Sequence, residues 1–561
     1  MTHLTTQFPV RRRGLLATLI GATAFFALLG FSASSANALP FNPTRTDDPS
    51  PVMCGGNCSL REAITAANGT PGPDTIQLQG GQTYTLSIPV SGGGGVLNGD
   101  LDISDDVTIE TVGDGGNATI FGNGRFVTND RVLEITGGTT TLRGVDIVGG
   151  VGPSDGGNPP HHLGGGIQVD PSASLNVLDS NINGNSVPGL GDLGGGIFNN
   201  NGTVLLQRTM VAGNTASGGF GGGIDTVGAN AETSILNSKL FDNDGFAGGG
   251  FAAGGGETEV FNSQMSFNSS GDGGAGFVGN GSVNFTNATI NNNRTDTMGG
   301  ALRATGGTTT FKNSTISTNV AGDESGGISA KDLNNGGTIT FTDTIIANNI
   351  DGDPTDGMHP DCQDQTGGLI VTLGFNIVGN GAGCGLTPMN GDHIGTPGSP
   401  VDPGLAPGTS YTGGPGTGLT WSILQNGLAM DNGNPMPGAC ASEDARGVPR
   451  QLGGRCDIGA WEFVTCGNQV VDRNGDGADN TSDEKSMSPT DGNDGIVGLG
   501  GNDAMDGGIG DDALCGGKGA DTLHGNAGND MLIGGKGKHD VCIGGKGHDT
   551  AKGCEVKRSI P

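Results

Sequence analysis

Between residues 76 and 385, short stretches of alternating apolar and polar residues are separated by glycine and asparagine. Residues 308–316 (TTTFKNSTI) show the alternation, with Ser, Thr and Asn at most polar positions. A period of two indicates a strand with one buried face. The pattern therefore predicts many short, half-buried strands.

The same segment repeats every 25 to 30 residues. A glycine cluster is followed by an apolar residue, and further on an aliphatic residue stands three positions before an asparagine. The apolar residues are Ile167, Ile197, Ile224, Phe251, Phe277, Leu302 and Ile328. The asparagines are Asn185, Asn214, Asn243, Asn268, Asn293, Asn319 and Asn349. The two series stay in phase, which predicts stacked coils of one design.

Such a stack resembles a right-handed parallel β-helix. We expect apolar residues to point inward, the asparagines to stack at one corner with each amide bonded to the next, and glycines to occupy the corners with positive φ. The alternative, an antiparallel sandwich, would not keep an asparagine and an aliphatic residue in phase over seven copies.

The N-terminal residues 1–38 resemble a secretory signal. Three arginines, Arg11 to Arg13, precede an apolar run over 14–31 and a small-residue cleavage pattern that ends at Ala38. An uncleaved membrane anchor is the alternative, and both the general and the twin-arginine export routes stay open. No second apolar run of this length occurs, so we expect no membrane span in the mature chain.

Residues 58–64 (CSLREAI) predict a short helix. Ser59 and Glu62 have the spacing of a capping box, and the helix is expected to run to about Asn68 and to close the first coil. The stretch resembles the CSLREA domain, which implies a secreted or surface protein and no catalytic residue. We assign residues 39–75 to this cap.

Residues 386–465 resemble the choice-of-anchor Q region. The resemblance rests on the motifs DPGL at 402–405, AMD at 429–431 and CDIGAWE at 456–462. It implies a small anchor-like region after the β-helix.

Ten cysteines favour an oxidising compartment. We expect local disulfides within the first three groups and a bridge between Cys542 and Cys554 in the fourth, with zinc as the alternative for the first pair. The groups are Cys54 and Cys58; Cys362 and Cys384; Cys440 and Cys456; and Cys466, Cys515, Cys542 and Cys554.

Residues 489–554 carry a second repeat with a period of nine, G-G-x-G-x-D-x-U-x, where U is apolar. Its aspartates are Asp494, Asp503, Asp512, Asp521, Asp530, Asp540 and Asp549. Its apolar positions are Ile496, Met505, Leu514, Leu523 and Leu532. The repeat resembles the RTX calcium-binding β-roll, whereas the alternative is a flexible Gly/Asp-rich tail.

Two nonapeptides make one turn of such a roll, so aspartates eighteen residues apart should stack. Carboxylates held this close repel one another, and Ca2+ prefers six to eight oxygen ligands. The seven aspartates allow five stacked pairs, and we expect several bound calcium ions. The predicted fold is therefore all-β: a right-handed parallel β-helix, a small anchor-like region and a C-terminal parallel β-roll.

The acidic linker at 466–488 contains a weaker candidate. Asp472, Asn474 and Asp476 begin like an EF-hand loop, but the twelfth position is Asp483 instead of Glu. An ordinary acidic turn is the alternative.

The net charge of −31 makes nucleic acid an improbable partner. Sequence alone favours a secreted, calcium-binding surface or adhesion-type protein that binds a polysaccharide or a protein. A calcium-dependent polysaccharide lyase or uronan epimerase is the alternative, because some alginate epimerases join a β-helix to RTX repeats. The charged β-helix residues look scattered, aromatic residues are few, and His161 and His162 are interpreted as a polar loop. No catalytic residue is predicted.

Overall fold

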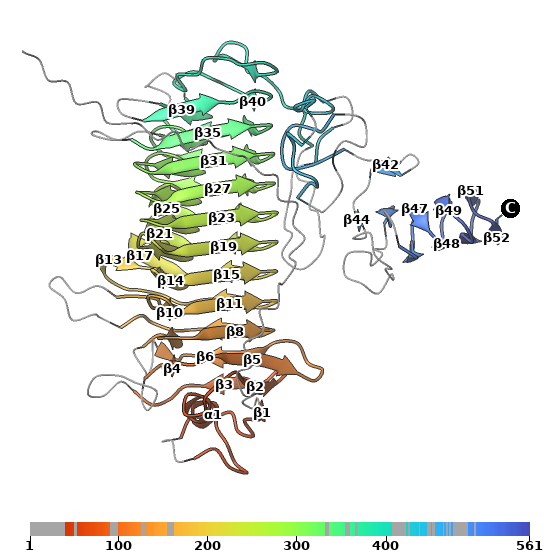
Figure 1. The fold of residues 1–561 in the computed structure, drawn as a ribbon. Coiled ribbons are helices and arrows are strands. Elements are labelled where there is room, and N and C mark those ends of the chain that lie inside the picture. The colour runs from red at the N-terminus through yellow and green to blue at the C-terminus, as the bar shows by residue number, and fades with distance from the viewer. Residues whose placement is uncertain are drawn as a thin grey trace, which may run out of the picture. The chain divides into compact units, whose positions relative to one another are not determined.

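The computed structural model describes residues 40–560 except 50–52, 90–98, 125–129, 154–161, 331–335, 354–358, 365–367, 407–421, 425–426, 437, 446–449, 451–454, 464, 467–468, 471–472, 475–491 and 499–500. Almost all regular structure in the described chain is β (Figure 1). Its one α-helix, α1 (Leu60–Ala67), has eight residues, and none of the described helices is long and apolar enough to cross a bilayer.

The first part of the chain is a parallel β-helix of four sheets (Figure 1), as the repeats predict. Sheet A holds β1 (Pro40–Phe41), β2 (Asp74–Gln79), β5 (Val107–Val112), β8 (Thr139–Arg143), β11 (Ser174–Leu178), β15 (Thr203–Gln207), β19 (Glu232–Leu236), β23 (Glu257–Phe261), β27 (Ser282–Thr286), β31 (Thr308–Lys312), β35 (Thr338–Thr342) and β39 (Leu369–Thr372). Sheet B holds β3 (Thr83–Thr85), β6 (Ala118–Phe121), β9 (Val145–Val148), β12 (Asn181–Asn183), β16 (Met210–Ala212), β20 (Lys239–Phe241), β24 (Gln264–Ser266), β28 (Thr289–Asn291), β32 (Thr315–Ser317), β36 (Ile345–Ala347), β40 (Ile377–Val378) and β41 (His393–Ile394).

The other two sheets complete each coil. Sheet C holds β4 (Leu101–Ile103), β7 (Leu133–Ile135), β10 (Ile167–Val169), β14 (Ile197–Asn200), β18 (Ile224–Val227), β22 (Phe251–Ala253), β26 (Gly276–Val278), β30 (Leu302–Ala304), β34 (Ile328–Ser329) and β38 (Cys362–Gln363). Sheet D holds β13 (Leu190–Leu193), β17 (Thr215–Phe220), β21 (Asp244–Ala247), β25 (Ser269–Asp272), β29 (Arg294–Thr295), β33 (Val320–Ala321) and β37 (Ile350–Asp351). The described strands of these four sheets pair in parallel, for example β18 with β22.

The core is a column of inward-facing apolar residues, with one departure from the predicted series. Ile167, Ile197 and Ile224 are in register on sheet C and buried, as expected. Phe251 is paired with Gly276 and not with Phe277. The Phe251 ring occupies the space that a side chain at Gly276 would need, so Phe277 turns outward, where its ring centroid lies 5.9 Å from that of Phe220.

The asparagine ladder is confirmed. Asn268 Nδ2 donates to Asn293 Oδ1 at 2.9 Å and also to a backbone carbonyl of the preceding coil. The same amide-to-amide bond joins each neighbouring pair from Asn185 to Asn349. Asp361 ends the ladder by accepting from Asn349 at 2.9 Å. Because these groups are buried, every coil depends on the next for its hydrogen bonds.

The prediction that glycines fill the positive-φ corners is only partly correct. Glycines do so where sheet D turns into sheet C, for example Gly221 and Gly248. In seven coils the corner between sheets A and B has a residue other than glycine: Asp179, Arg208, Asn237, Asn262, Asn287, Asn313 and Asp343, with φ between 46° and 53°. Asn and Asp tolerate this conformation. We call these seven residues the corner row.

The short helix and the capping box predicted for residues 58–64 are present in α1. Ser59 accepts from Glu62 N–H, and the Glu62 side chain accepts from Ser59 N–H, which forms the predicted capping box. Arg61 is fully buried and pairs with Asp48 at 2.7 Å. Cys54 and Cys58 form a disulfide, so this pair is not a zinc site.

The described residues between 429 and 463, which we call the strap, pack against the β-helix. Ala429, Ile458 and Trp461 share a buried apolar cluster with Ile345 and Ile377. The strap also forms hydrogen bonds with three residues of the corner row. Asn434 N–H donates to Asp343 Oδ1 at 2.7 Å, and Ala441 N–H donates to Asn313 Oδ1 at 2.7 Å. The Arg450 guanidinium donates to Asn287 Oδ1 at 3.1 Å.

Four further disulfides occur. The predicted bridges Cys362–Cys384 and Cys440–Cys456 are present, and Cys542 pairs with Cys554. The fifth, Cys466–Cys515, spans 49 residues and was not predicted.

Candidate calcium-binding site

The C-terminal repeats form two parallel sheets. Sheet E holds β44 (Arg473–Asn474), β45 (Gly495–Val497), β47 (Ala513–Gly519), β49 (Met531–Gly537) and β51 (Thr550–Lys552). Sheet F holds β46 (Ala504–Asp506), β48 (Thr522–Ala527), β50 (Val541–Lys546) and β52 (Val556–Arg558). A short antiparallel hairpin, β42 (Thr465–Cys466) and β43 (Gln469–Val470), precedes them. The five predicted apolar residues and Cys542 form the buried core between the sheets.

Each predicted aspartate stands directly before a strand and is buried. In every stacked pair the backbone N–H of the earlier aspartate donates to Oδ1 of the later one, at 2.8 to 3.0 Å. The five pairs are 494/512, 503/521, 512/530, 521/540 and 530/549. The structure thus brings together all seven aspartates in the two stacks that their spacing predicts.

The second carboxylate oxygen, Oδ2, faces a glycine in the preceding turn. A Cβ on Gly525 would collide with Asp530 Oδ2 and would also lie 2.7 Å from the carbonyl oxygen of Gly544. Equivalent pairs of oxygens surround Gly498 (Asp503 and Gly516), Gly507 (Asp512 and Gly525), Gly534 (Asp540 and Gly553) and Gly544 (Asp549 and Ser559). The missing side chains therefore leave spaces bounded by oxygen atoms.

These spaces suit a hard divalent cation. Oδ2 of Asp530, Asp540 and Asp549 is buried and accepts no hydrogen bond from any described residue. Burial raises the pKa of Asp530, and repulsion from Asp549 and Asp511 raises it further. A bound Ca2+ would supply the positive charge that these carboxylates lack, with carboxylate and carbonyl oxygens as ligands.

A second row of polar side chains, not predicted from the sequence, runs beside the stacked aspartates. Asn493, Asn502, Asp511 and Asn529 each stand immediately before a stacked aspartate. Asp511 N–H donates to Asn493 Oδ1 at 2.9 Å, and Asn529 N–H donates to Asp511 Oδ1 at 2.7 Å. Their fixed place in the nonapeptide was the signal that could have identified them.

The EF-hand-like triplet is placed only in part. Asp472 and Asp476 lie outside the described residues. The backbone of Asn474 belongs to β44, which pairs in parallel with β45 and so adds a strand to the roll. The EF-hand interpretation stays a prediction.

A family model confirms what the repeats are. The RTX calcium-binding nonapeptide repeat matches residues 490–523 and 516–551. This segment consists of RTX repeats. The RTX segment, residues 490–551, thus carries the calcium-binding motif within a chain whose remaining residues the model does not match.

Two solved structures resemble the chain. The pectate lyase Pel9A has 14% sequence identity and a TM-score of 0.44, over 76% of this chain and 97% of that one. The PL6 family alginate lyase AlyGC has 10% identity and a TM-score of 0.30, over 88% of this chain and 70% of that one. No curated protein sequence matches the chain.

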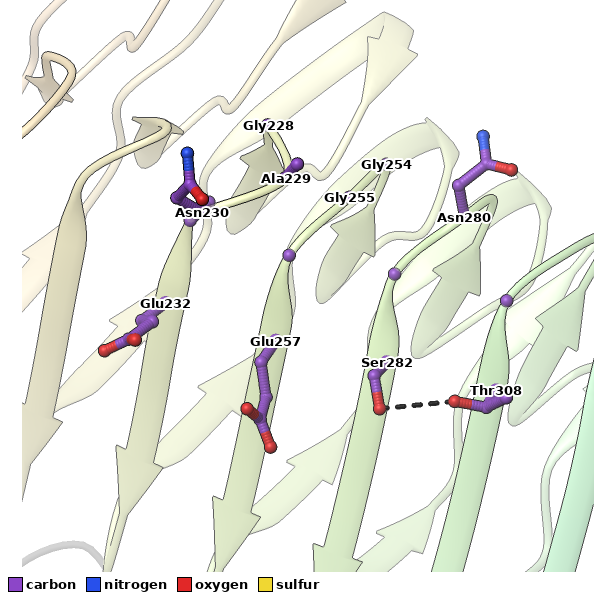
Figure 2. Close-up of a pocket in the computed structure, with 14 residues that line it drawn as sticks. Gly228, Ala229, Asn230, Glu232, Gly254, Gly255, Glu257, Asn280, Ser282 and Thr308 are labelled. Atoms are coloured by element: carbon purple, nitrogen blue, oxygen red, sulfur yellow. Dashed lines mark hydrogen bonds between the residues drawn. The ribbon is translucent and has the colours of Figure 1, made fainter. Parts of the chain in front are cut away.

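The β-helix carries an open groove along the turns that lead into β19, β23, β27 and β31 of sheet A (Figure 2). Its volume is about 770 Å3. Glu232, Glu257, Ser282 and Thr308 come from four successive strands and follow one another along it, and Ser282 and Thr308 share a hydrogen bond of 3.2 Å. Turn glycines form much of the lining.

A second cluster brings carboxylates and an arginine together on sheet C, which the sequence did not suggest. Oxygens of Asp100, Asp102 and Glu134 lie within 4.8 Å of one another. Arg131 Nη1 lies 2.9 Å from Glu134 Oε2 and 3.6 Å from Asp100 Oδ2. Burial raises the pKa of Asp102 to about 6, and the charge of Glu134 adds to the effect.

Three charged or titratable residues of the β-helix, Arg303, Asp225 and His162, lie in separate surroundings. Arg303 pairs with Asp272, Asp225 is fully buried beside the backbone of Thr226, and His162 Nδ1 lies 3.1 Å from the buried Asp192. His161 lies outside the described residues.

Proposed function

We propose that this is a secreted, calcium-binding surface protein whose RTX segment folds on calcium and whose β-helix binds a polysaccharide or protein partner. The stacked aspartates carry the calcium part of the proposal, because five pairs of buried carboxylates face spaces bounded by oxygen atoms. Five disulfides support an extracellular location.

The groove of Figure 2 is our candidate for the partner surface. Hydroxyl and carboxylate groups repeat along it at the spacing of neighbouring strands, so it offers hydrogen bonds at regular intervals to an extended, hydroxyl-rich chain. Glu232 and Glu257 are exposed and would repel a polyanion. A neutral polysaccharide therefore fits this groove better than a uronan does.

The calcium part is tested on the full chain by circular dichroism and thermal melting, with calcium and with an excess of EGTA. We expect a transition that calcium shifts to higher temperature, because ligands that bind only the folded state stabilise it. Identical spectra and melting in both conditions would overturn the proposal.

The partner surface is tested with Glu232→Gln/Glu257→Gln against a panel of neutral and acidic polysaccharides. Weaker retention of a neutral glycan by this variant, but not by Glu259→Gln on the same sheet, is the expected result. Equal retention by both variants would place the partner surface elsewhere.

The sheet C cluster favours a second candidate, a calcium-dependent lyase or epimerase. Such a reaction needs an acid, a base and a cation that neutralises the uronate, and Asp102, Glu134 and Arg131 are groups of these types. Assays on alginate and pectate test it: turnover lost in Arg131→Gln but kept in Glu259→Gln would support the enzyme, whereas no turnover on either substrate would exclude these substrates.

A further inference from the structure

Beyond the last nonapeptide, Glu555 occupies the place of an aspartate. Asp540 N–H donates to Glu555 Oε2 at 2.8 Å. In the five stacked pairs, the earlier aspartate donates to a carboxylate in the same way. The match to the RTX model ends at residue 551, so no repeat motif identifies this acid.

The backbone places Glu555 in the same register. In the regular coils the residue after the later aspartate donates its N–H to the carbonyl of the earlier one, as Met531 does to Asp512 at 2.7 Å. Val556, which follows Glu555, donates to the carbonyl of Asp540 at 3.0 Å. Strands β50 and β52 continue this pairing, with Val541 opposite Val556.

The equivalence of Glu555 to the stacked aspartates cannot be predicted from residue spacing. Only fifteen residues separate Asp540 from Glu555, whereas the earlier pairs are eighteen or nineteen apart. The disulfide between Cys542 and Cys554 holds the shortened coil, because Cys542 lies in the roll core and Cys554 directly precedes Glu555.

Oxygen atoms converge at this last coil as they do elsewhere in the roll. Asp540 is fully buried, and its Oδ2 accepts no hydrogen bond from the described residues. A Cβ on Gly534 would lie 2.8 Å from this oxygen and would collide with the carbonyl oxygen of Gly553. Gly553 belongs to the same short coil as Glu555, so a carboxylate and a carbonyl reach Asp540 from it.

We propose that Glu555 is a ligand of a terminal calcium site, formed with Asp540 and the carbonyl of Gly553, that closes the calcium-binding stack. The inference rests on calcium binding by the RTX segment. The proposed site adds one ligand that lies outside the nonapeptides, in a coil that lacks their sequence motif. A carboxylate is a suitable calcium ligand, and the longer Glu side chain serves where the coil is shorter.

The alternative is a purely structural role, in which Glu555 only accepts the Asp540 N–H. Glu555→Gln separates the two roles because the amide oxygen still accepts that hydrogen bond while the charge is lost. Calorimetric calcium titration of the full chain, together with melting in EGTA, measures both. Glu259→Gln removes the same charge from an exposed position on sheet A and is the matched control.

We expect Glu555→Gln to bind one calcium ion fewer than wild type, or to bind its weakest ion at least about tenfold more weakly, while melting in EGTA is unchanged. Calcium binding equal to wild type would overturn the terminal site. A wild-type chain that binds no calcium would instead overturn the proposed function. If Glu555→Gln melts lower in EGTA, Glu555→Asp decides, since it keeps the charge: a retained but weakened ion supports the site, and unchanged affinity refutes it.

Discussion

Asp512 N–H donates to Oδ1 of Asp530 at 3.0 Å, although eighteen residues separate them in the chain. Asp512 Oδ1 in turn accepts from Asp494 N–H at 2.8 Å. One aspartate therefore links three successive coils and contributes to two neighbouring stacked pairs. A substitution at Asp512 should disturb calcium binding on both sides.

Asp512→Asn should weaken calcium binding without lowering the stability of the calcium-free protein. The amide keeps an oxygen for Asp494 N–H and removes a charge that its neighbours repel. A lost site forfeits about 2.7 kcal/mol of stabilisation at a hundredfold excess of calcium, so the calcium-induced shift in melting temperature should shrink. Glu259→Gln should keep the full shift, and an unchanged shift in Asp512→Asn would contradict the ligand role.

Gly525→Ala tests the oxygen-bounded spaces. Gly525 has no positive φ, so alanine is compatible with its backbone, but the Cβ would enter the space between Asp530 Oδ2 and the Gly544 carbonyl. We expect calcium affinity to fall by about tenfold or more, measured by titration. Gly398→Ala, where a Cβ meets nothing within 4 Å, should bind calcium normally.

Asn268→Ala should destabilise the β-helix by about 2–4 kcal/mol, because it leaves several buried hydrogen-bonding groups unsatisfied. The lost bonds join Asn243, Asn293 and the carbonyl of Leu240. Urea unfolding in saturating calcium measures the effect. Asn284→Ala removes an outward-facing side chain that is hydrogen-bonded to Glu257, and it should lower the free energy of unfolding far less. Similar decreases in the two variants would contradict a stabilising role of the ladder.

Asp225 makes stability depend on pH. Burial raises its pKa to about 7, so the folded chain retains this proton at a pH where the unfolded chain has lost it. The contribution of Asp225 to the free energy of unfolding therefore falls as pH rises from about 4 to about 7. Asp225→Asn should be more stable than wild type by about 2–4 kcal/mol at pH 8 and similar near pH 4, as measured by chemical unfolding at both pH values.

Other carboxyl groups with raised pKa values do not affect this comparison. Asp361 and Glu462, with pKa values of about 6 and about 7, remain in both proteins. The difference between wild type and Asp225→Asn isolates the single group. A difference that does not change with pH would show that Asp225 is ionised in the folded protein.

The regular features of the molecule could be predicted because they repeat. In the asparagine ladder and in the aspartate stacks, the same residue type recurs at the same position of every coil. The spacing alone therefore predicts which residues contact one another. Phe277 shows where this fails: the glycine before it takes the inward position because the neighbouring Phe251 ring is large. That competition for space is invisible in the repeat pattern.

Features that occur once could not be predicted from spacing. Arg131 and Glu134 meet Asp100 and Asp102 across a coil of irregular length, and Glu555 follows a coil shorter than the others. The Cys466–Cys515 bridge joins residues whose sequence context offers no pairing rule. In each case backbone register, and not residue type, brings the groups together.

The Cys466–Cys515 disulfide has a mechanical consequence. It lets tension bypass the 49-residue span between the two cysteines, a length of chain that would otherwise extend by about 170 Å. A pull on the C-terminus would pass through the Cys542–Cys554 bridge and reach Cys515 after unravelling only residues beyond it. The earlier coils would then stay tethered, ready to refold around returning ions once the load is released.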